Sequence, residues 1–284
     1  MTKVIIPTDF SENAKHALTQ SIDFFREESC EFFIIHAYAD EVYDNNAYLA
    51  RALFNDIKEK AKAASNEKLM AVLEYAQDTT PSPKHHFRIR SIFQSLIDAI
   101  DDMVNQEGAD IVVMGTKGAT NAPGITFGSN TLQVIRHVES PVLVIPESYV
   151  FNRPKNILFP TNFMIPYNRR ELKLLNYMGM DFRATIHLLI QATSKKLTNR
   201  KQDNKQLIQE MLHSCKQELH FESGTGLVET INNFIEVHHI DLLVMVNSHQ
   251  SYLDDMLHKT TIDKIGLTTK IPFLVLQNID RCSC

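Results

Sequence analysis

Three pairs of similar segments occur along the chain, and the duplication they indicate restricts its fold more than any other feature. In each pair, a short apolar run keeps similar flanking residues. The pairs are VIIPTDF (4–10) with ILFPTNF (157–163), ADIVVMG (109–115) with IDLLVMV (240–246), and SPVLVIP (140–146) with IPFLVLQ (271–277). Landmarks repeated in the same order indicate an internal duplication, so the chain is expected to contain two copies of one fold.

The spacing of the repeats reveals a length difference between the copies. The first pair is 153 residues apart and the other two are 131 apart, so the second copy is 153 − 131 = 22 residues shorter in its middle. The polar segment from Val42 to about Gln77 is the natural place for the extra residues of the first copy. A length of 284 residues also suits two domains. We predict domains at residues 1–147 and 154–280, joined by a short polar linker.

Within each copy, short apolar runs alternate with helical patterns, which indicates βαβ units and a parallel sheet. Ser11 is a candidate N-cap, and a helix expected from Ser91 to Asn105 places Ile92 on its apolar face. In copy one we expect strands at 2–7, 32–38, 84–90, 110–114 and 141–146, and helices at 11–28, 48–76, 91–106 and 128–138. The fold class is therefore α/β: two tandem, five-stranded, doubly wound, Rossmann-like domains.

Two segments of copy one carry residues suited to binding a ligand at the carboxyl ends of the strands. Pro7, Thr8 and Asp9 end the first strand. A glycine-rich loop then follows the fourth strand and leads into a helix start that offers unpaired N–H groups to a phosphate. Its residues are Gly115, Lys117, Gly118, Gly128, Ser129, Asn130 and Thr131, with the glycines in a G-x2-G-x9-G-S pattern.

These residues resemble the universal stress protein family in its tandem two-domain form. The resemblance rests on the glycine pattern after DIVVMG, on the opening PTDFSENAKHAL, on the strand end IIHAY and on the closing SPVLVIP. It covers nearly the whole chain and implies adenine nucleotide alpha hydrolase-like domains. It also implies a site in copy one for ATP or AMP, with Mg²⁺ or Mn²⁺ accompanying the nucleotide.

The resemblance implies a role for each site residue. Thr8 and Asp9 would contact the adenosine and the metal, and Ala37 would meet the base through its main chain. Met114 and Gly115 would flank the adenosine, with Lys117 and Gly118 at the phosphates. The phosphates would also be bound through backbone and hydroxyl groups by Gly128, Ser129, Asn130 and Thr131. The full set of expected site residues is Pro7, Thr8, Asp9, Ala37, Met114, Gly115, Lys117, Gly118, Gly128, Ser129, Asn130 and Thr131, with Asp9 as the metal ligand.

Copy two has lost this pattern. Its counterparts of Gly115, Gly118 and Gly128 are Val246, His249 and Lys259, and Asn162 replaces Asp9. A β-branched residue where the backbone must approach a phosphate costs on the order of 1 kcal/mol. Losing hydrogen bonds to a charged group costs about 1.5–3 kcal/mol each. We therefore predict that copy two does not bind nucleotide as copy one does.

Composition and spacing argue against several classes of partner. A net charge of −5 with interspersed signs provides no basic stripe for nucleic acid. No apolar run approaches the ~20 residues of a membrane span, which predicts a soluble cytoplasmic protein. The cysteines at 30, 215, 282 and 284 lack CxxC spacing and suit a reducing compartment. The adjacent pairs His85–His86 and His238–His239 lack the i, i+4 spacing of zinc ligands on one helix face, so zinc is not expected there.

The function most consistent with these features is a stress-response sensor or regulator that binds an adenine nucleotide. No nucleophile is paired with a base at recognisable spacing, so an enzyme is disfavoured, with slow ATP hydrolysis as the upper limit. An interaction module is one alternative, because the apolar last strands (142–145 and 273–276) could pair the two copies as an internal pseudo-dimer or form a homodimer. A small-molecule or lipid carrier using the cleft of copy two is the other.

Overall fold

The structure is a computed structural model of the chain, and it divides into two compact units with the boundary between Glu147 and Ser148. It describes residues 1–46, 51–79, 82–116, 127–164, 166–167, 169–192, 196–223, 226–248, 251–253 and 270–278. Lys117 and Gly118 of the expected site lie outside these residues, as do the counterparts His249 and Lys259. None of the described helices is both long enough and apolar enough to cross a membrane.

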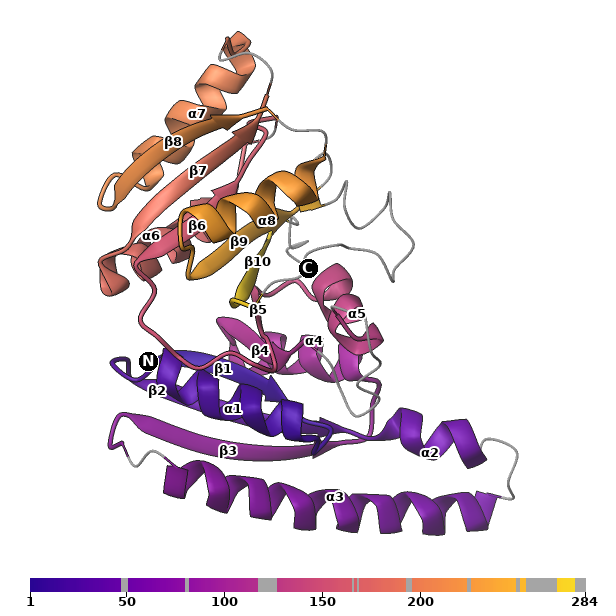
Figure 1. Cartoon of the computed structure of the whole chain (residues 1–284). Helices are drawn as coiled ribbons and strands as arrows, with labels where there is room; N and C mark the ends of the chain where they lie inside the picture. Colours follow the sequence, from indigo (N-terminus) through magenta and orange to yellow (C-terminus); the bar gives the residue numbers. More distant parts are fainter. Residues whose placement is uncertain are drawn as a thin grey trace. The chain divides into compact units, whose positions relative to one another are not determined.

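The first unit is a five-stranded parallel sheet with strand order β3-β2-β1-β4-β5. Strands and helices alternate along the chain, as Figure 1 shows. The elements are β1 (Thr2–Pro7), α1 (Glu12–Phe24), β2 (Cys30–Ala37), α2 (Ala39–Asn46), α3 (Arg51–Thr79), β3 (His85–Ile92), α4 (Leu96–Glu107), β4 (Ile111–Gly115), α5 (Ser129–His137) and β5 (Val142–Ile145).

The second unit repeats this arrangement, with strand order β8-β7-β6-β9-β10 and parallel pairing throughout. Its elements are β6 (Asn156–Pro160), α6 (Arg169–Phe182), β7 (Thr185–Gln191), α7 (Asn199–Met211), β8 (Lys216–Glu222), α8 (Leu227–Val237), β9 (Leu242–Asn247) and β10 (Phe273–Gln277). The duplication and the predicted doubly wound α/β fold are therefore confirmed.

The central strands are apolar because they are covered on both faces. In the first unit, Ile5, Ile34 and Val112 are fully buried, and Leu158 and Val244 are fully buried in the second. Helix α1 packs against β4, and α3 runs alongside β3 (Figure 1). In both units the chain builds one side of the sheet first and then crosses to the other. The switch points lie between β1 and β4 and between β6 and β9, and ligand crevices in such sheets open there.

The length difference between the copies lies where the spacing predicted it. Helix α3 has 29 residues, whereas its counterpart α7 has 13. The structure adds a short helix, α2, which was not expected.

The start of α4 was predicted wrongly. The helix expected from Ser91 begins at Leu96, because Ile92 still pairs with Ala37 in the sheet. The hydroxyl of Ser95 then accepts a hydrogen bond from the Asp98 amide and caps the helix. Ile92 is therefore a strand residue and not part of the apolar face of the helix. The predicted N-cap Ser11 of α1 is confirmed, since it accepts from the Ala14 amide.

Candidate functional site

The first wall of the site is a tight turn at the end of β1, formed by Pro7–Phe10. The Thr8 hydroxyl accepts a hydrogen bond from the Phe10 amide at 3.0 Å, and a carboxylate oxygen of Asp9 accepts one from the Ser11 amide at 3.0 Å. Phe10 has φ 64°, a left-handed conformation that costs a bulky residue about 1–2 kcal/mol. The turn therefore holds Thr8 and Asp9 in place at the carboxyl end of the central strand.

The second wall is the end of β2, where His36 lies in a buried hydrogen-bond network. Its Nδ1 is 2.9 Å from the Ser65 hydroxyl, and its Nε2 is 3.2 Å from a carboxylate oxygen of Glu41. The Ser65 hydroxyl in turn contacts Ser91 at 2.6 Å. Burial lowers the pKa of His36, and the Glu41 carboxylate opposes that shift. The Phe10 ring packs on the imidazole with centroids 4.5 Å apart, which joins this wall to the first.

The third wall is the end of β4 together with the start of α5. Gly128 is the N-cap of α5 and has no side chain to cap it, so the first N–H groups of the helix are left for other acceptors. Its φ of −65° is open to any residue, so a glycine here matters for close approach and not for backbone conformation. The Thr131 hydroxyl donates to the Gly115 carbonyl at 3.0 Å. Thr131 therefore fastens the helix to β4, and its proton is not available to a phosphate in this arrangement.

A cleft of about 170 Å³ opens between these walls. It lies at the switch point between β1 and β4 and brings together residues from five separate stretches of the first unit (7–14, 36–41, 96, 114–115 and 130–131). Eight of the twelve expected site residues line it: Pro7, Thr8, Asp9, Ala37, Met114, Gly115, Asn130 and Thr131. Of the other four, Gly128 and Ser129 stand beside it at the start of α5, and Lys117 and Gly118 lie outside the described residues.

Five lining residues were not expected from the sequence: Ala14, His36, Asp40, Glu41 and Leu96. Asp40 and Glu41 directly follow β2, and Leu96 follows β3, so the rule that ligands bind at the carboxyl ends of strands could have indicated them. The side chains of Asp9, Asp40 and Glu41 give the cleft three carboxylates. Phosphates are therefore expected at the opposite end, near the start of α5, or with a cation beside them.

A larger hollow of about 860 Å³ lies elsewhere in the first unit, along His85–Arg88 of β3. Its other lining residues include Met1 and Glu31, at the amino ends of β1 and β2. Doubly wound sheets bind their ligands at the opposite end of the strands. The smaller cleft is therefore the better candidate site.

The second unit keeps the turn but fills the place of the cleft with its own side chains. Phe163 also has a positive φ, of 54°, and Asn162 accepts from the Met164 amide at 3.0 Å just as Asp9 accepts from Ser11. However, Thr161 is fully buried and contacts the Tyr167 hydroxyl at 2.9 Å. Tyr167 is itself 4% exposed, and burial raises its pKa to about 12.

A second tyrosine takes the main-chain groups that correspond to those of Ala37. The backbone amide of Thr8 donates to the Ile35 carbonyl, and the backbone amide of Thr161 donates to the Leu189 carbonyl. Ile35 therefore corresponds to Leu189, and Ala37, two residues after Ile35, corresponds to Gln191. The Tyr252 hydroxyl accepts from the Gln191 amide at 3.1 Å and donates to its carbonyl at 3.4 Å. A main-chain position expected to meet a base in the first unit is thus hydrogen-bonded internally in the second.

Comparison with known proteins identifies the family. The model of the universal stress protein family matches residues 1–146, just over half of the chain. A universal stress protein of Methanocaldococcus jannaschii is 28% identical over 162 residues, covering 50% of this chain and 93% of its own length. The crystal structure of a universal stress protein from Archaeoglobus fulgidus matches 97% of this chain and 98% of its own, with a TM-score of 0.65 at 17% identity, which supports the fold.

One further structure is relevant to ligands but too dissimilar to carry weight. A universal stress protein family protein of Arabidopsis thaliana with AMP bound is 16% identical, covers 51% of this chain and 92% of its own, and has a TM-score of 0.35. The family match to residues 1–146 covers more than half of the chain and identifies its family. The chain belongs to the universal stress protein family.

Proposed function

We propose that the chain is a stress-response protein whose first unit binds an adenine nucleotide, ATP or AMP, and that it acts as a sensor or regulator through that binding. One observation carries the proposal. Residues expected at the site from four separate stretches of sequence (7–9, 37, 114–115 and 130–131) line one cleft at the switch point of the sheet. Doubly wound folds bind nucleotides at this position.

The residues present suit a nucleotide with a divalent cation. The start of α5 offers N–H groups and partial positive charge to phosphate oxygens. Asp9 supplies a carboxylate, and Mg²⁺ is commonly held by one or two carboxylates together with the phosphates of its ligand. A bound Mg²⁺ or Mn²⁺ would neutralise charge between the phosphates and this acidic wall. The volume lined by the described residues is about 170 Å³, smaller than the ~300 Å³ at which small-molecule sites begin.

Binding without dedicated catalysis is the proposed activity. The chain Glu41–His36–Ser65 has the residue types of a hydrolase triad, but Ser65 is 2% exposed and its hydroxyl is shared with Ser91. A buried serine cannot reach a substrate, so this network positions His36 in the cleft wall. Slow hydrolysis assisted by Asp9 and a metal is the most that the cleft residues would support.

The second unit has a structural role in this proposal. Tyr167 and Tyr252 hydrogen-bond the groups equivalent to those that would meet the nucleotide in the first unit. Pairing of the two copies through their last strands, β5 and β10, stays a prediction, as does further dimerisation. A carrier function or a purely interacting role becomes the better proposal if no nucleotide binds.

The test is to identify the ligand released from native protein by mass spectrometry and to titrate the ligand-free protein with ATP and Mg²⁺, and with AMP, by calorimetry. We expect one nucleotide per chain. The Gly128→Val variant should lose binding, because a side chain at the N-cap of α5 blocks close approach of an oxygen. Gly226→Val is the matched control: Gly226 is the N-cap of α8 and a Cβ added there meets nothing within 4 Å. No nucleotide in the native protein and no heat on titration would refute the proposal.

A further inference from the structure

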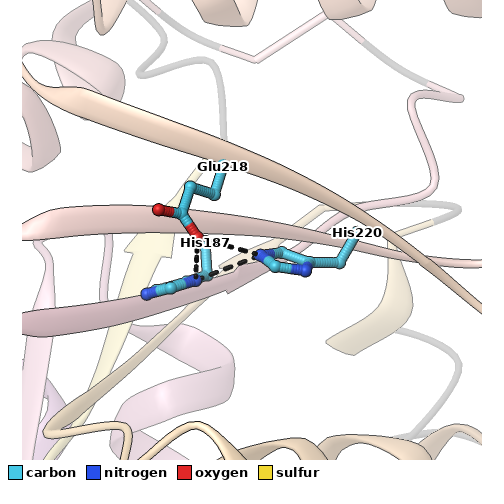
Figure 2. A group of neighbouring side chains, drawn as sticks. All are labelled: His187, Glu218 and His220. Carbon is cyan, nitrogen blue, oxygen red and sulfur yellow. Dashed lines mark hydrogen bonds and ion pairs between the residues drawn. The ribbon is translucent and has the colours of Figure 1, made fainter.

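Three potential metal ligands meet on one face of the sheet in the second unit. His187 comes from β7, and Glu218 and His220 come from the neighbouring strand β8, as Figure 2 shows. Their ligand atoms all lie within 4.8 Å of one another.

Strand geometry explains why these residues meet although they are far apart in sequence. Glu218 and His220 are two residues apart on β8, so both side chains point to the same face. His187 is the register partner of Glu218 across the parallel pair. The three side chains are therefore held together by the backbone pairing of two strands, which is a rigid framework.

The distances suit a tetrahedral metal ion. His187 Nδ1 lies 3.1 Å from His220 Nε2, and a carboxylate oxygen of Glu218 lies 3.7 Å from the first and 3.8 Å from the second. Bonds of about 2.0–2.1 Å around a tetrahedral Zn²⁺ place neighbouring donor atoms roughly 3.3–3.4 Å apart. Shifts of a few tenths of an ångström would bring the three atoms to that spacing.

The partners outside the ligand set orient the imidazole of His187 for metal binding. Its Nε2 is 3.2 Å from the side-chain oxygen of Asn156, and that amide is oriented by its own donation to the His239 carbonyl. The proton is thereby assigned to Nε2, and the lone pair of Nδ1 points toward His220 and Glu218. Histidines that bind metals in proteins typically donate their other N–H in this way.

The carboxylate of Glu218 is held by a second neighbour. Its other oxygen accepts from the Lys216 ammonium at 2.7 Å, and this hydrogen bond lowers the pKa of Glu218. Two imidazole nitrogens and one carboxylate oxygen therefore face one another.

The cluster is buried on one side and open on the other. The side chain of His187 is 6% exposed, that of His220 is 19% exposed and that of Glu218 is 40% exposed. The rings of Phe234 and His238, at the end of α8, pack near His220 with centroid distances of 4.9 and 5.3 Å. The exposed side of the Glu218 carboxylate is therefore where an ion and a fourth ligand such as water would enter.

We propose that His187, Glu218 and His220 form a site for Zn²⁺, with water or another small ligand in the fourth position. Two imidazoles and one carboxylate are a ligand set that zinc takes in open sites, whereas Mg²⁺ and Ca²⁺ take oxygen ligands. The site is in the unit whose nucleotide motif is lost. It therefore gives this unit a binding capacity independent of the nucleotide proposed for the first.

The experiment is a zinc titration of the full chain, prepared without a histidine tag and stripped of metal with a chelator. Cys282 and Cys284 are replaced by serine so that the C-terminal cysteines cannot supply the ligands. Zn²⁺ is titrated in competition with a chromophoric chelator, and Co²⁺ is used as a spectroscopic probe. We expect one Zn²⁺ per chain, no competition from Mg²⁺, and a Co²⁺ spectrum without bands from thiolate coordination.

Two variants test the ligands, and a third is the control. Glu218→Gln and His220→Gln should weaken zinc binding by more than the ~10–100-fold expected for the loss of a partner outside the ligand set. His213→Gln should bind like the parent, because His213 is an exposed histidine of the same unit whose ring contacts Glu210 and Ser214. Circular dichroism and thermal melting of the metal-free variants check that each is folded. Failure of the parent to bind Zn²⁺, or undiminished binding by both Glu218→Gln and His220→Gln, overturns the proposal.

Discussion

Replacing Asp9 by asparagine separates two roles of its side chain: accepting the hydrogen bond that shapes the turn, and supplying a negative charge to a bound cation. One oxygen of Asp9 accepts a hydrogen bond from the Ser11 amide at 3.0 Å and so shapes the turn. The second unit performs the same job with Asn162, which accepts from the Met164 amide at the same distance. The turn therefore needs a side-chain oxygen but no charge. Asp9→Asn should leave the free energy of unfolding within about 0.5 kcal/mol of the parent value, as for other changes that keep their contacts.

For nucleotide binding, the charge is expected to matter if the carboxylate meets a cation beside the nucleotide. Losing a hydrogen bond or contact to a charged group costs about 1.5–3 kcal/mol, which is about a 10- to 150-fold weaker affinity. We expect Asp9→Asn to weaken binding of ATP in the presence of Mg²⁺ by that factor. Binding of AMP without metal should change little.

Calorimetric titration with and without Mg²⁺, alongside urea unfolding, measures both effects. Asp9→Ala is the companion variant: it removes the turn oxygen as well, and it should cost about 0.5–2 kcal/mol of stability, as loss of a similar side-chain-to-amide hydrogen bond at a helix N-terminus does. Unchanged binding of ATP with Mg²⁺ by Asp9→Asn would show that Asp9 is not a metal ligand. A large loss of stability in Asp9→Asn would show that the charge is structural.

Three further changes probe buried contacts in the two units. Burial lowers the pKa of His36, so the folded state disfavours the protonated form of this side chain. The stability that neutral His36 contributes is present above about pH 6.5, and it is lost as the pH falls toward the lower pKa of the folded state. His36→Gln should therefore flatten the fall in stability between about pH 7 and pH 5 in urea unfolding, and an unchanged slope would contradict this. Tyr252→Phe removes the hydroxyl that bonds both main-chain groups of Gln191 and should cost about 0.5–3 kcal/mol by thermal melting, without creating nucleotide binding in the second unit. In Gly179→Ala the new Cβ would lie 2.7 Å from Cys215 Sγ. This clash should lower the free energy of unfolding by about 1–3 kcal/mol, and the higher helix propensity of alanine should offset about 1 kcal/mol of that loss. If the loss persists in the Cys215→Ala background, this clash is not its cause.

The repeats and the strand-end motifs made much of the fold and the cleft predictable. The turn at Pro7–Asp9 and the start of α5 are local in sequence, and the switch-point rule brings them together once the strand order is known. The position of α4 was predicted wrongly because a β-branched residue, Ile92, fits both a helix face and a strand. The capping contact of Ser95 decided between them.

Other parts of the candidate sites depend on contacts that no local pattern encodes. The zinc cluster requires the register of β7 against β8, which pairs His187 with Glu218. The alternation of Glu218 and His220 along one strand was visible, but nothing in the sequence placed His187 opposite them. The same holds for Tyr252, whose hydroxyl reaches Gln191 across 61 residues.

In the second unit, the hydroxyl of Tyr252 occupies the main-chain groups of Gln191 that correspond to those expected to meet a base in the first unit. Because Tyr252 is part of the chain, its local concentration is fixed and does not vary with the contents of the cell. The stability of this unit should then not depend on nucleotide concentration, whereas that of the first should rise by about 2.7 kcal/mol at 100 times the Kd. On heating, one unfolding transition should shift with added nucleotide and the other should stay in place as an internal reference. A single polypeptide would thus contain one half whose stability responds to nucleotide and one half whose stability does not.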